Sequence, residues 1–259
     1  MNPNQLKSKK MARQKGIIKL KGTIGDVSFY KTQDGHLARE KGGVDASRIA
    51  NDPAFIRTRE NGAEFGSAAS SGKLLRDALR TLLMNASDNR VTARLTKLMT
   101  DVKNLDATSA RGERSVGVAI STPIAKSAMK GFNFNSRALL GGVLFKPYAV
   151  NTATGVITIN GIIPIDDIAF PNGATHMSIK GAWAKVDFAN GTYQVELTNT
   201  TNVPIDATSS NVILTPSAVP VGAGVDIYLL MVEFHQEVNA VQYSLKNGAY
   251  NALSIVEVN

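Results

Sequence analysis

The chain has 259 residues, no cysteine and a formal net charge of +8 at pH 7. This length is enough for one large domain or two ordinary ones with a sizeable core. The lack of cysteine excludes disulfides, thiolate metal sites and cysteine nucleophiles. We expect no membrane-spanning segment and no secretory signal, because no apolar run is long enough and Met1–Leu20 is basic.

Charge is divided unevenly along the chain. Residues 1–150 contain 26 Lys/Arg and 12 Asp/Glu, a net +14, whereas residues 151–259 contain 3 and 9, a net −6. Such an asymmetry favours two regions with different functions. Three interpretations stay open: a nucleic-acid surface, a basic face that meets the acidic face of the next subunit, or a solvated charged exterior.

The N-terminal residues predict a basic arm followed by a hairpin. Met1–Lys15 is too polar to fold alone, so we expect it to be ordered only against a neighbour or not at all. Gly16–Lys21 alternates weakly and Val27–Lys31 is typical of a strand. Asp34-Gly35 is a type I′ turn signal before a returning strand, His36–Arg39.

The longest predicted element is a charged helix over Asn51–Asn85. Pro53 suits its first turn, and small or apolar residues recur at helical spacing from Phe65 to Leu82. Unbroken, this helix would span roughly 48 Å, about twice the extent of a small domain. We therefore expect part of its length to rest on a partner.

Glycine and alanine form a stripe of small residues along this helix. Gly62, Gly66 and Gly72 lie near Ala69 at helical spacing, and each glycine costs about 1 kcal/mol in a helix interior. We interpret the stripe as a surface for close approach of another backbone, from a second subunit. The alternative is that the helix breaks into two near Ser70-Ser71-Gly72.

Two further helices are predicted before the chain changes character. Asp88 is a candidate cap for a helix with an apolar stripe from Val91 to Val102, and its short connection favours a helical hairpin with the first helix. Ser121–Lys130 is a shorter candidate. Phe132 and Phe134 then alternate with asparagine, as at the edge of a sheet.

From about Val143 onward the pattern is that of strands. Asn190-Gly191 and Asn247-Gly248 predict hairpins, and regularly spaced turns predict an antiparallel β-sandwich. Val225–Glu237 should be central, and the last strand could lie at an edge open to a neighbour. The predicted strands are Gly155–Ile163, His176–Phe188, Thr192–Leu197, Asn211–Leu214, Val225–Glu237, Tyr243–Leu245 and Tyr250–Val258.

The predicted fold class is therefore α+β in three parts. Residues 1–15 form the basic arm, residues 16–142 the hairpin and helical assembly domain, and residues 143–259 the β-sandwich. This division follows the change from helical to alternating periodicity.

No constellation of residues predicts catalysis, and we expect no enzyme, cofactor, metal or small-molecule substrate. His36, His176 and His235 fall in three different elements. Glu233 and Glu237 flank the last of these on one strand face, which favours a solvated strand end over a metal site. The segment Gly66–Leu74 departs from a phosphate-binding loop in its spacing and in its leucine at the Ser/Thr position.

Two other functions stay open as alternatives. Basic helical residues could contact phosphates, non-specifically because few aromatic residues accompany them; the candidates are Arg76, Arg80, Arg90 and Arg94. A glycan- or protein-binding β-sandwich is the other alternative, with Trp183 and Tyr193 as candidate contacts. Such residues are more often part of a core or a sheet surface.

Several N-terminal motifs carry a resemblance. Gly25-Asp26-Val27-Ser28-Phe29-Tyr30-Lys31, the Asp34-Gly35 turn and the Asn51-Asp52-Pro53 helix start resemble the opening of structural-type proteins of Bacteroidota bacteria and their viruses. The resemblance covers about residues 16–85 and implies no activity or site. The order of basic arm, extended hairpin and long helix is similar to the start of viral shell proteins of the HK97 type, from which the β-rich C-terminal half departs.

Together these features predict a non-enzymatic structural subunit that assembles with copies of itself into a filament, tube or shell. Pairing of the hairpin or arm with a neighbour's strand edge would hold the subunits together, and attraction between the +14 and −6 regions would guide their register. The predicted interface residues are Lys15, Ile17, Ile18, Val27, Phe29, Phe55, Gly62, Phe65, Gly66 and Ala69.

Overall fold

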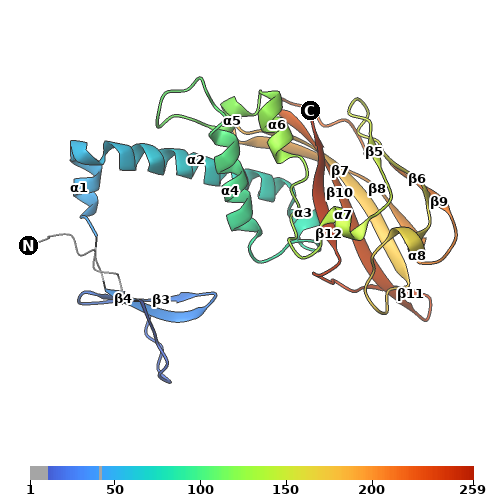
Figure 1. The fold of residues 1–259 in the computed structure, drawn as a ribbon, viewed down its shortest axis with the longest axis horizontal. Coiled ribbons are helices and arrows are strands. Elements are labelled where there is room, and N and C mark those ends of the chain that lie inside the picture. Colours follow the sequence, from blue (N-terminus) through green and yellow to red (C-terminus); the bar gives the residue numbers. More distant parts are fainter. Residues whose placement is uncertain (1–10, 41–42) are drawn as a thin grey trace, which may run out of the picture. The chain divides into compact units, whose positions relative to one another are not determined.

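The structure, a computed structural model, describes residues 11–40 and 43–259. The chain divides into two compact units, residues 1–59 and 60–259 (Figure 1). Neither predicted boundary, after residue 15 or after residue 142, coincides with this division. Most of the predicted basic arm, residues 1–10, lies outside the described residues.

The N-terminal unit contains a four-stranded antiparallel sheet in the order β1-β4-β3-β2. Its strands are β1 (Met11–Arg13), β2 (Gly22–Ile24), β3 (Val27–Thr32) and β4 (Gly35–Glu40). β3 and β4 confirm the predicted hairpin, in which Thr32 pairs with Gly35 around a two-residue turn. The predicted type I′ turn at Asp34-Gly35 is wrong, because the turn residues are Gln33 and Asp34, which have no positive φ, and Gly35 already belongs to β4. The weak strand predicted over Gly16–Lys21 is wrong, because that segment is a loop between β1 and β2.

Two capped turns lead from the sheet into the long helix. The side chain of Asp45 accepts a hydrogen bond from the Ser47 amide at the start of α1 (Ala46–Asn51). Asp52 caps a 3-10 turn, η1 (Pro53–Phe55), in the same way. α2 then runs over Ile56–Ala78, about 35 Å, so it is shorter than predicted but continuous through the glycine-rich stretch.

In the second unit, α2 and α4 (Val91–Lys103) contact each other in opposite chain directions. Gly72 lies against Leu95, and Arg76 donates a hydrogen bond of 3.0 Å to Thr92. These contacts confirm the predicted helical hairpin. Among the described residues, no helix is long and apolar enough to cross a membrane. The shorter helices are α3 (Arg80–Leu83), α5 (Val116–Ala119), α6 (Pro123–Met129), α7 (Leu140–Val143) and α8 (Pro164–Asp167).

The C-terminal half contains a curled antiparallel sheet of five strands and a smaller sheet of three (Figure 1). The larger sheet contains β7 (His176–Asp187), β8 (Thr192–Pro204), β10 (Val225–Val238), β11 (Val241–Ser244) and β12 (Ala252–Val258). As predicted, β10 is central: it pairs with β7 along one of its sides and with β12 and β11 along the other, and β8 pairs with the far side of β7. The smaller sheet contains β5 (Ala149–Val150), β6 (Ile157–Ile162) and β9 (Ser210–Leu214).

One predicted hairpin and the predicted open edge are wrong. Asn190-Gly191 does join β7 to β8, but β12 pairs with β10 and not with β11, so Asn247-Gly248 forms no hairpin. The far edge of β12 is also covered. There the Phe134 amide donates to the Leu253 carbonyl at 2.8 Å, and Asn133 bridges to Ser254.

Two hydrophobic clusters stabilise the second unit. The first lies between the helices and one face of the large sheet and includes Leu75, Leu95 and Ile227. The second includes Tyr228 of the large sheet and Ile159 of the small one. Because the first cluster joins residues from both sides of position 142, the helices and the large sheet form one unit.

Candidate subunit interface

The N-terminal unit has no core of its own in the part that the structure describes. From Ala12 to Arg59, none of the described residues is buried, and side chains such as Phe29 and Leu37 are only half-buried. A sheet is stable when another layer covers its apolar face. No second layer within this unit therefore packs on the apolar side chains of the four described strands.

The β1–β2 loop (residues 14–21) holds two isoleucines in full exposure. Gln14 closes its neck: the side-chain oxygen accepts from the Leu20 amide at 2.8 Å, and the side-chain nitrogen donates to the Leu37 carbonyl at 3.0 Å. Ile17 and Ile18 are 102% and 80% exposed. Burying an isoleucine side chain stabilises by about 1.5–3 kcal/mol. Burial of these two isoleucines against another protein surface therefore offsets the entropy that is lost when the loop becomes ordered.

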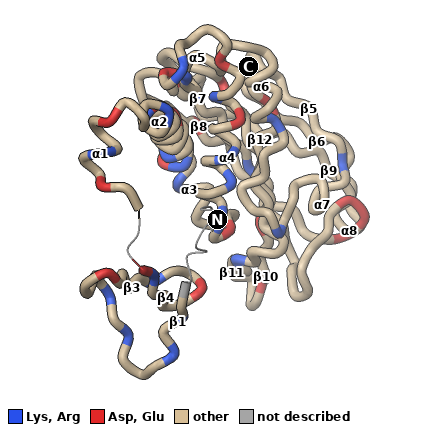
Figure 2. Tube along the Cα trace, turned by 60° about the vertical axis from the view of Figure 1, so that its left-hand side comes forward, with Lys and Arg blue, Asp and Glu red and all other residues tan. Residues whose placement is uncertain are grey.

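Cationic residues surround the two isoleucines. Figure 2 shows Lys and Arg along the segment that joins β1 to β2. They are the exposed residues Arg13, Lys15, Lys19 and Lys21. No acidic residue precedes Asp26 in the sequence, so this part of the chain is uniformly basic.

The stripe of small residues on α2 separates into two parts. A Cβ at Gly72 would lie 3.6 Å from Leu95 Cγ, so this glycine serves packing within the chain. Around Gly62 and Gly66, by contrast, no described atom lies within 4 Å of an added Cβ. Phe65, between them, is 59% exposed. The N-terminal part of the stripe therefore lies open, with a large apolar side chain beside it.

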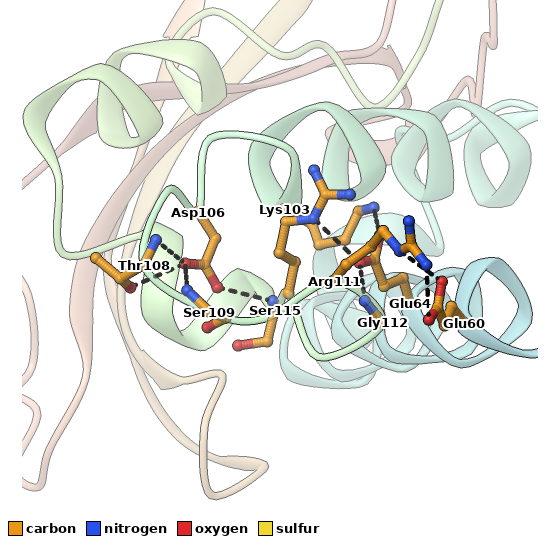
Figure 3. A network of polar contacts seen from close by, with 10 residues as sticks. Glu60, Glu64, Lys103, Asp106, Thr108, Ser109, Arg111, Gly112 and Ser115 are labelled. Carbon is orange, nitrogen blue, oxygen red and sulfur yellow. Dashed lines mark hydrogen bonds and ion pairs between the residues drawn. The ribbon is translucent and has the colours of Figure 1, made fainter. Parts of the chain in front are cut away.

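Glu64 anchors α2 from its buried side, within the network in Figure 3. Its carboxylate pairs with Lys103 on α4 and with Arg114 at 3.0 Å, and accepts from the Gly112 amide at 2.8 Å. The hydrogen bond from Lys103, aided by those from Gly112 and Arg114, lowers the pKa of Glu64 from 4.5 to about 2. These bonds fix the rotation of α2, and thereby keep Phe65 exposed.

Two other predicted interface residues are half-buried within the chain. Phe55 lies below the Arg48 guanidinium, which is 5.7 Å from the ring centroid. Ala69 is partly covered, and Val27 and Lys15 are exposed. The structure thus places most of the predicted interface residues in two groups, one on the N-terminal sheet and its loop and one on α2, with Phe55 on η1.

The four predicted phosphate contacts differ in their availability. Arg94 bonds within the protein, donating to Asp88 at 2.6 Å and to the Phe134 carbonyl at 2.9 Å. Arg76 is half-buried, whereas Arg80 and Arg90 are exposed. A phosphate role for Arg94 therefore loses its structural basis.

The candidate glycan contact Trp183 is buried and its indole N–H donates to Asp226 at 2.7 Å. It therefore offers no ligand platform, although Tyr193 is exposed. His176 and His235 lie opposite each other on β7 and β10. Among the described residues, no group of three or more His, Asp and Glu is arranged to hold a metal ion.

Sequence reasoning did not identify Gln14 or Glu64. Gln14 has no local signal, because its partners depend on the loop that it closes. Glu64 has one: it falls at helical spacing with Ala68, Leu75 and Leu79, which are buried. An acidic residue in an apolar stripe indicates a buried partner.

Comparisons of the chain with protein families, with curated proteins and with solved structures find no match. The resemblance of residues 16–85 to structural-type proteins of Bacteroidota and their viruses therefore stays a prediction. Function is inferred from the geometry of this chain.

Proposed function

We propose that the protein is a non-enzymatic structural subunit that assembles with copies of itself through its N-terminal unit and the exposed part of α2. The observation that carries this proposal is the lack of any buried residue among those described between Ala12 and Arg59. A unit of 59 residues buries only a modest share of its surface on folding and is marginally stable on its own. The chain has no cysteine, so a neighbouring protein surface is the natural cover.

Charge supports a second copy as that neighbour. Residues 1–59 contain 13 Lys/Arg and 5 Asp/Glu, a net +8, whereas residues 60–259 contain 16 of each. Within the second unit, residues 151–259 have the net charge of −6. A basic N-terminal unit and an acidic C-terminal stretch of the same chain favour contacts between unlike surfaces of neighbouring copies, which give filaments or tubes when they do not close.

The second unit is the body of the subunit in this proposal. Side chains from both sheets meet in its second hydrophobic cluster. This packing supports the finer interpretation of residues 143–259 as an antiparallel β-sandwich.

The test is particle formation by the purified full-length chain. We expect large particles in light scattering and negative-stain microscopy, and a severalfold loss of particles when Ile17 and Ile18 are both replaced by serine. The matched control replaces Ile213 and Val219 by serine, since these are 56% and 59% exposed in the second unit. A parent protein that stays a monodisperse monomer at high concentration contradicts the proposal.

A second candidate function is non-specific nucleic-acid binding, favoured by the concentration of the chain's net charge in residues 1–59. If the four cations around the β1–β2 loop each contact a phosphate, log K should fall by roughly 3.6 per tenfold rise in salt. Retention on DNA measured across a salt series tests this. No retention at low salt dismisses it.

A further inference from the structure

In the second unit, two exposed apolar residues lie on backbone segments that contact the backbone of acidic residues. Phe145 and Ile165 are 57% and 51% exposed. Their backbone amides donate to the carbonyl oxygens of Asp167, at 2.8 Å, and Asp206, at 3.2 Å. We call Phe145, Ile165, Asp166 and Asp206 the α8 corner.

The α8 corner is negatively charged. Figure 2 shows acidic residues gathered at α8. Asp167 is paired with Lys146 at 3.3 Å, whereas Asp166 and Asp206 have no ion pair within the described residues. Between Lys146 and Lys180 the sequence contains no Lys or Arg. The corner therefore combines apolar surface with unneutralised carboxylates.

The β1–β2 loop has the complementary character. Its isoleucines are exposed in a segment that also carries exposed cationic residues, whereas the α8 corner combines the exposed Phe145 and Ile165 with the exposed Asp166 and the half-buried Asp206. A nucleic acid would satisfy the cations, but it would leave Ile17 and Ile18 without apolar contact. A protein surface that is both apolar and acidic satisfies both features, and this chain contains one.

We propose that the β1–β2 loop of one copy docks on the α8 corner of the next copy. This inference rests on the proposed function, and it names the two surfaces that meet. The contact is heterologous, because different surfaces of the two copies meet, so it repeats head to tail. Ile17 and Ile18 cover Phe145 and Ile165, while Lys15 and its basic neighbours face Asp166 and Asp206.

The chain's lack of cysteine makes a direct crosslinking test possible. Ile17→Cys and Ile165→Cys are prepared as two full-length variants that differ in tag size, mixed, assembled and treated with a short bismaleimide. We expect at least fivefold more mixed dimer than in the control mixture of Ile17→Cys with Val219→Cys. Val219 also lies in the second unit and is 59% exposed, against 51% for Ile165.

The outcomes separate this inference from the proposed function. Particles without excess Ile17–Ile165 crosslinks overturn the docking proposal and leave self-assembly standing. Absence of particles from the parent protein overturns self-assembly itself. Crosslinks mainly between two Ile17→Cys chains also overturn the docking proposal. A second measurement is sedimentation with phosphatidylserine vesicles. If the β1–β2 loop makes the chain sediment with the vesicles and no mixed crosslink forms, the docking proposal is overturned as well.

If a cysteine variant no longer assembles, variants with reversed charges test the docking proposal instead. Asp166→Lys alone should reduce the particle fraction severalfold, because it places a cation against the basic loop. Combining it with Lys15→Glu and Lys21→Glu should restore assembly, since the attraction is then reversed in sign but kept. Failure of the combined variant to recover overturns the proposal.

Discussion

The carboxylate of Glu64 on α2 and the ammonium group of Lys103 on α4 form an ion pair with side-chain exposures of only 4% and 6%. The two residues are 39 positions apart in the sequence. Their contact fixes how α2 lies on the second unit. It therefore also determines that Phe65 and the open glycines face away from the core.

Replacing Glu64 by glutamine should destabilise the second unit by about 3 kcal/mol. The change leaves the Lys103 ammonium buried without its counter-charge, and breaking one side of a buried pair typically costs about 3–5 kcal/mol. Urea unfolding monitored by the fluorescence of Trp183, the single tryptophan of the chain and a buried residue of β7, measures the loss.

The control for this variant lies on α4, the helix that carries the partner Lys103. Lys97 and Asp101 form an i,i+4 pair on α4 with side-chain exposures of 77% and 54%. Exposed pairs of this kind contribute about 0.3–0.5 kcal/mol, so Asp101→Asn should change the free energy of unfolding by no more than that. Equal losses for Glu64→Gln and Asp101→Asn would show that the buried pair has no special weight.

Stability should fall as the pH falls from about 4.5 to about 2. Burial alone would raise the pKa of Asp88, but hydrogen bonds from Ser136, Arg90 and Arg94 outweigh it and lower that pKa from 3.8 to about 2. The pKa of Glu64 is also lowered, chiefly by Lys103. Carboxylates whose pKa is lower in the folded state stabilise it above the unfolded pKa, and this stabilisation is lost on protonation.

Unfolding in urea at a series of pH values measures this effect. Glu64→Gln should reduce the decline below pH 4.5, because one of the carboxylates with a lowered pKa is then absent, whereas Asp101→Asn should retain it. A smaller loss should begin below pH 6.5, because burial lowers the pKa of His235 and disfavours its charged form in the folded state. A stability that is flat down to pH 2 would contradict both assignments.

Local sequence signals predicted much of the fold. Pro123 near the start of the predicted helix Ser121–Lys130 marked α6, Asn190-Gly191 marked the turn between β7 and β8, and the apolar run in β10 marked a central strand. Each of these signals acts within a few residues, where backbone geometry depends on side-chain type. Such features can be predicted without knowledge of the rest of the chain.

The features that could not be predicted depend on distant parts of the chain. Asn133 covers the edge of β12 at Ser254, more than a hundred residues away, so the last strand only appeared to be open. At the candidate site, Ile17 was predicted as an interface residue but on a strand, whereas it lies in a loop, and Gln14, which closes that loop, was not predicted. The buried pair of Glu64 and Lys103 forms only when α2 and α4 contact each other, so neither helix alone predicts it.

Ala240→Gly should stabilise the protein by about 1 kcal/mol. Asn239 and Ala240 form the turn between β10 and β11, with φ angles of 53° and 60°. A residue other than glycine with such a positive φ costs about 1–2 kcal/mol, and Asn-Gly is the preferred sequence for such turns. The missing glycine is also why this hairpin was not predicted.

Urea unfolding of Ala240→Gly against Ala249→Gly tests the turn. Ala249 is exposed and is not among the described residues with positive φ, so glycine there should lower stability by up to about 1 kcal/mol through the entropy of the unfolded chain. If both variants lose stability alike, strain at Ala240 does not limit this hairpin.

Alanine at Gly62 and Gly66 should stabilise the single chain but weaken assembly. Each substitution removes a helix-interior glycine and should gain up to about 1 kcal/mol in α2, since no described atom lies within 4 Å of the added Cβ. If a neighbouring copy's backbone lies on this open stripe, the same methyl groups hold it away. Thermal unfolding and light scattering of the double variant measure the two effects separately.

Gly72→Ala is the matched control, because it lies on the same helix but faces α4. Its added Cβ would lie 3.6 Å from Leu95 Cγ, an ordinary van der Waals distance, so the variant should gain stability and assemble as the parent does. A Gly62/Gly66 double variant that forms particles as readily as Gly72→Ala would show that no backbone approaches the stripe. The subunit contact would then lie in the N-terminal sheet and the β1–β2 loop, and α2 would take no part in it.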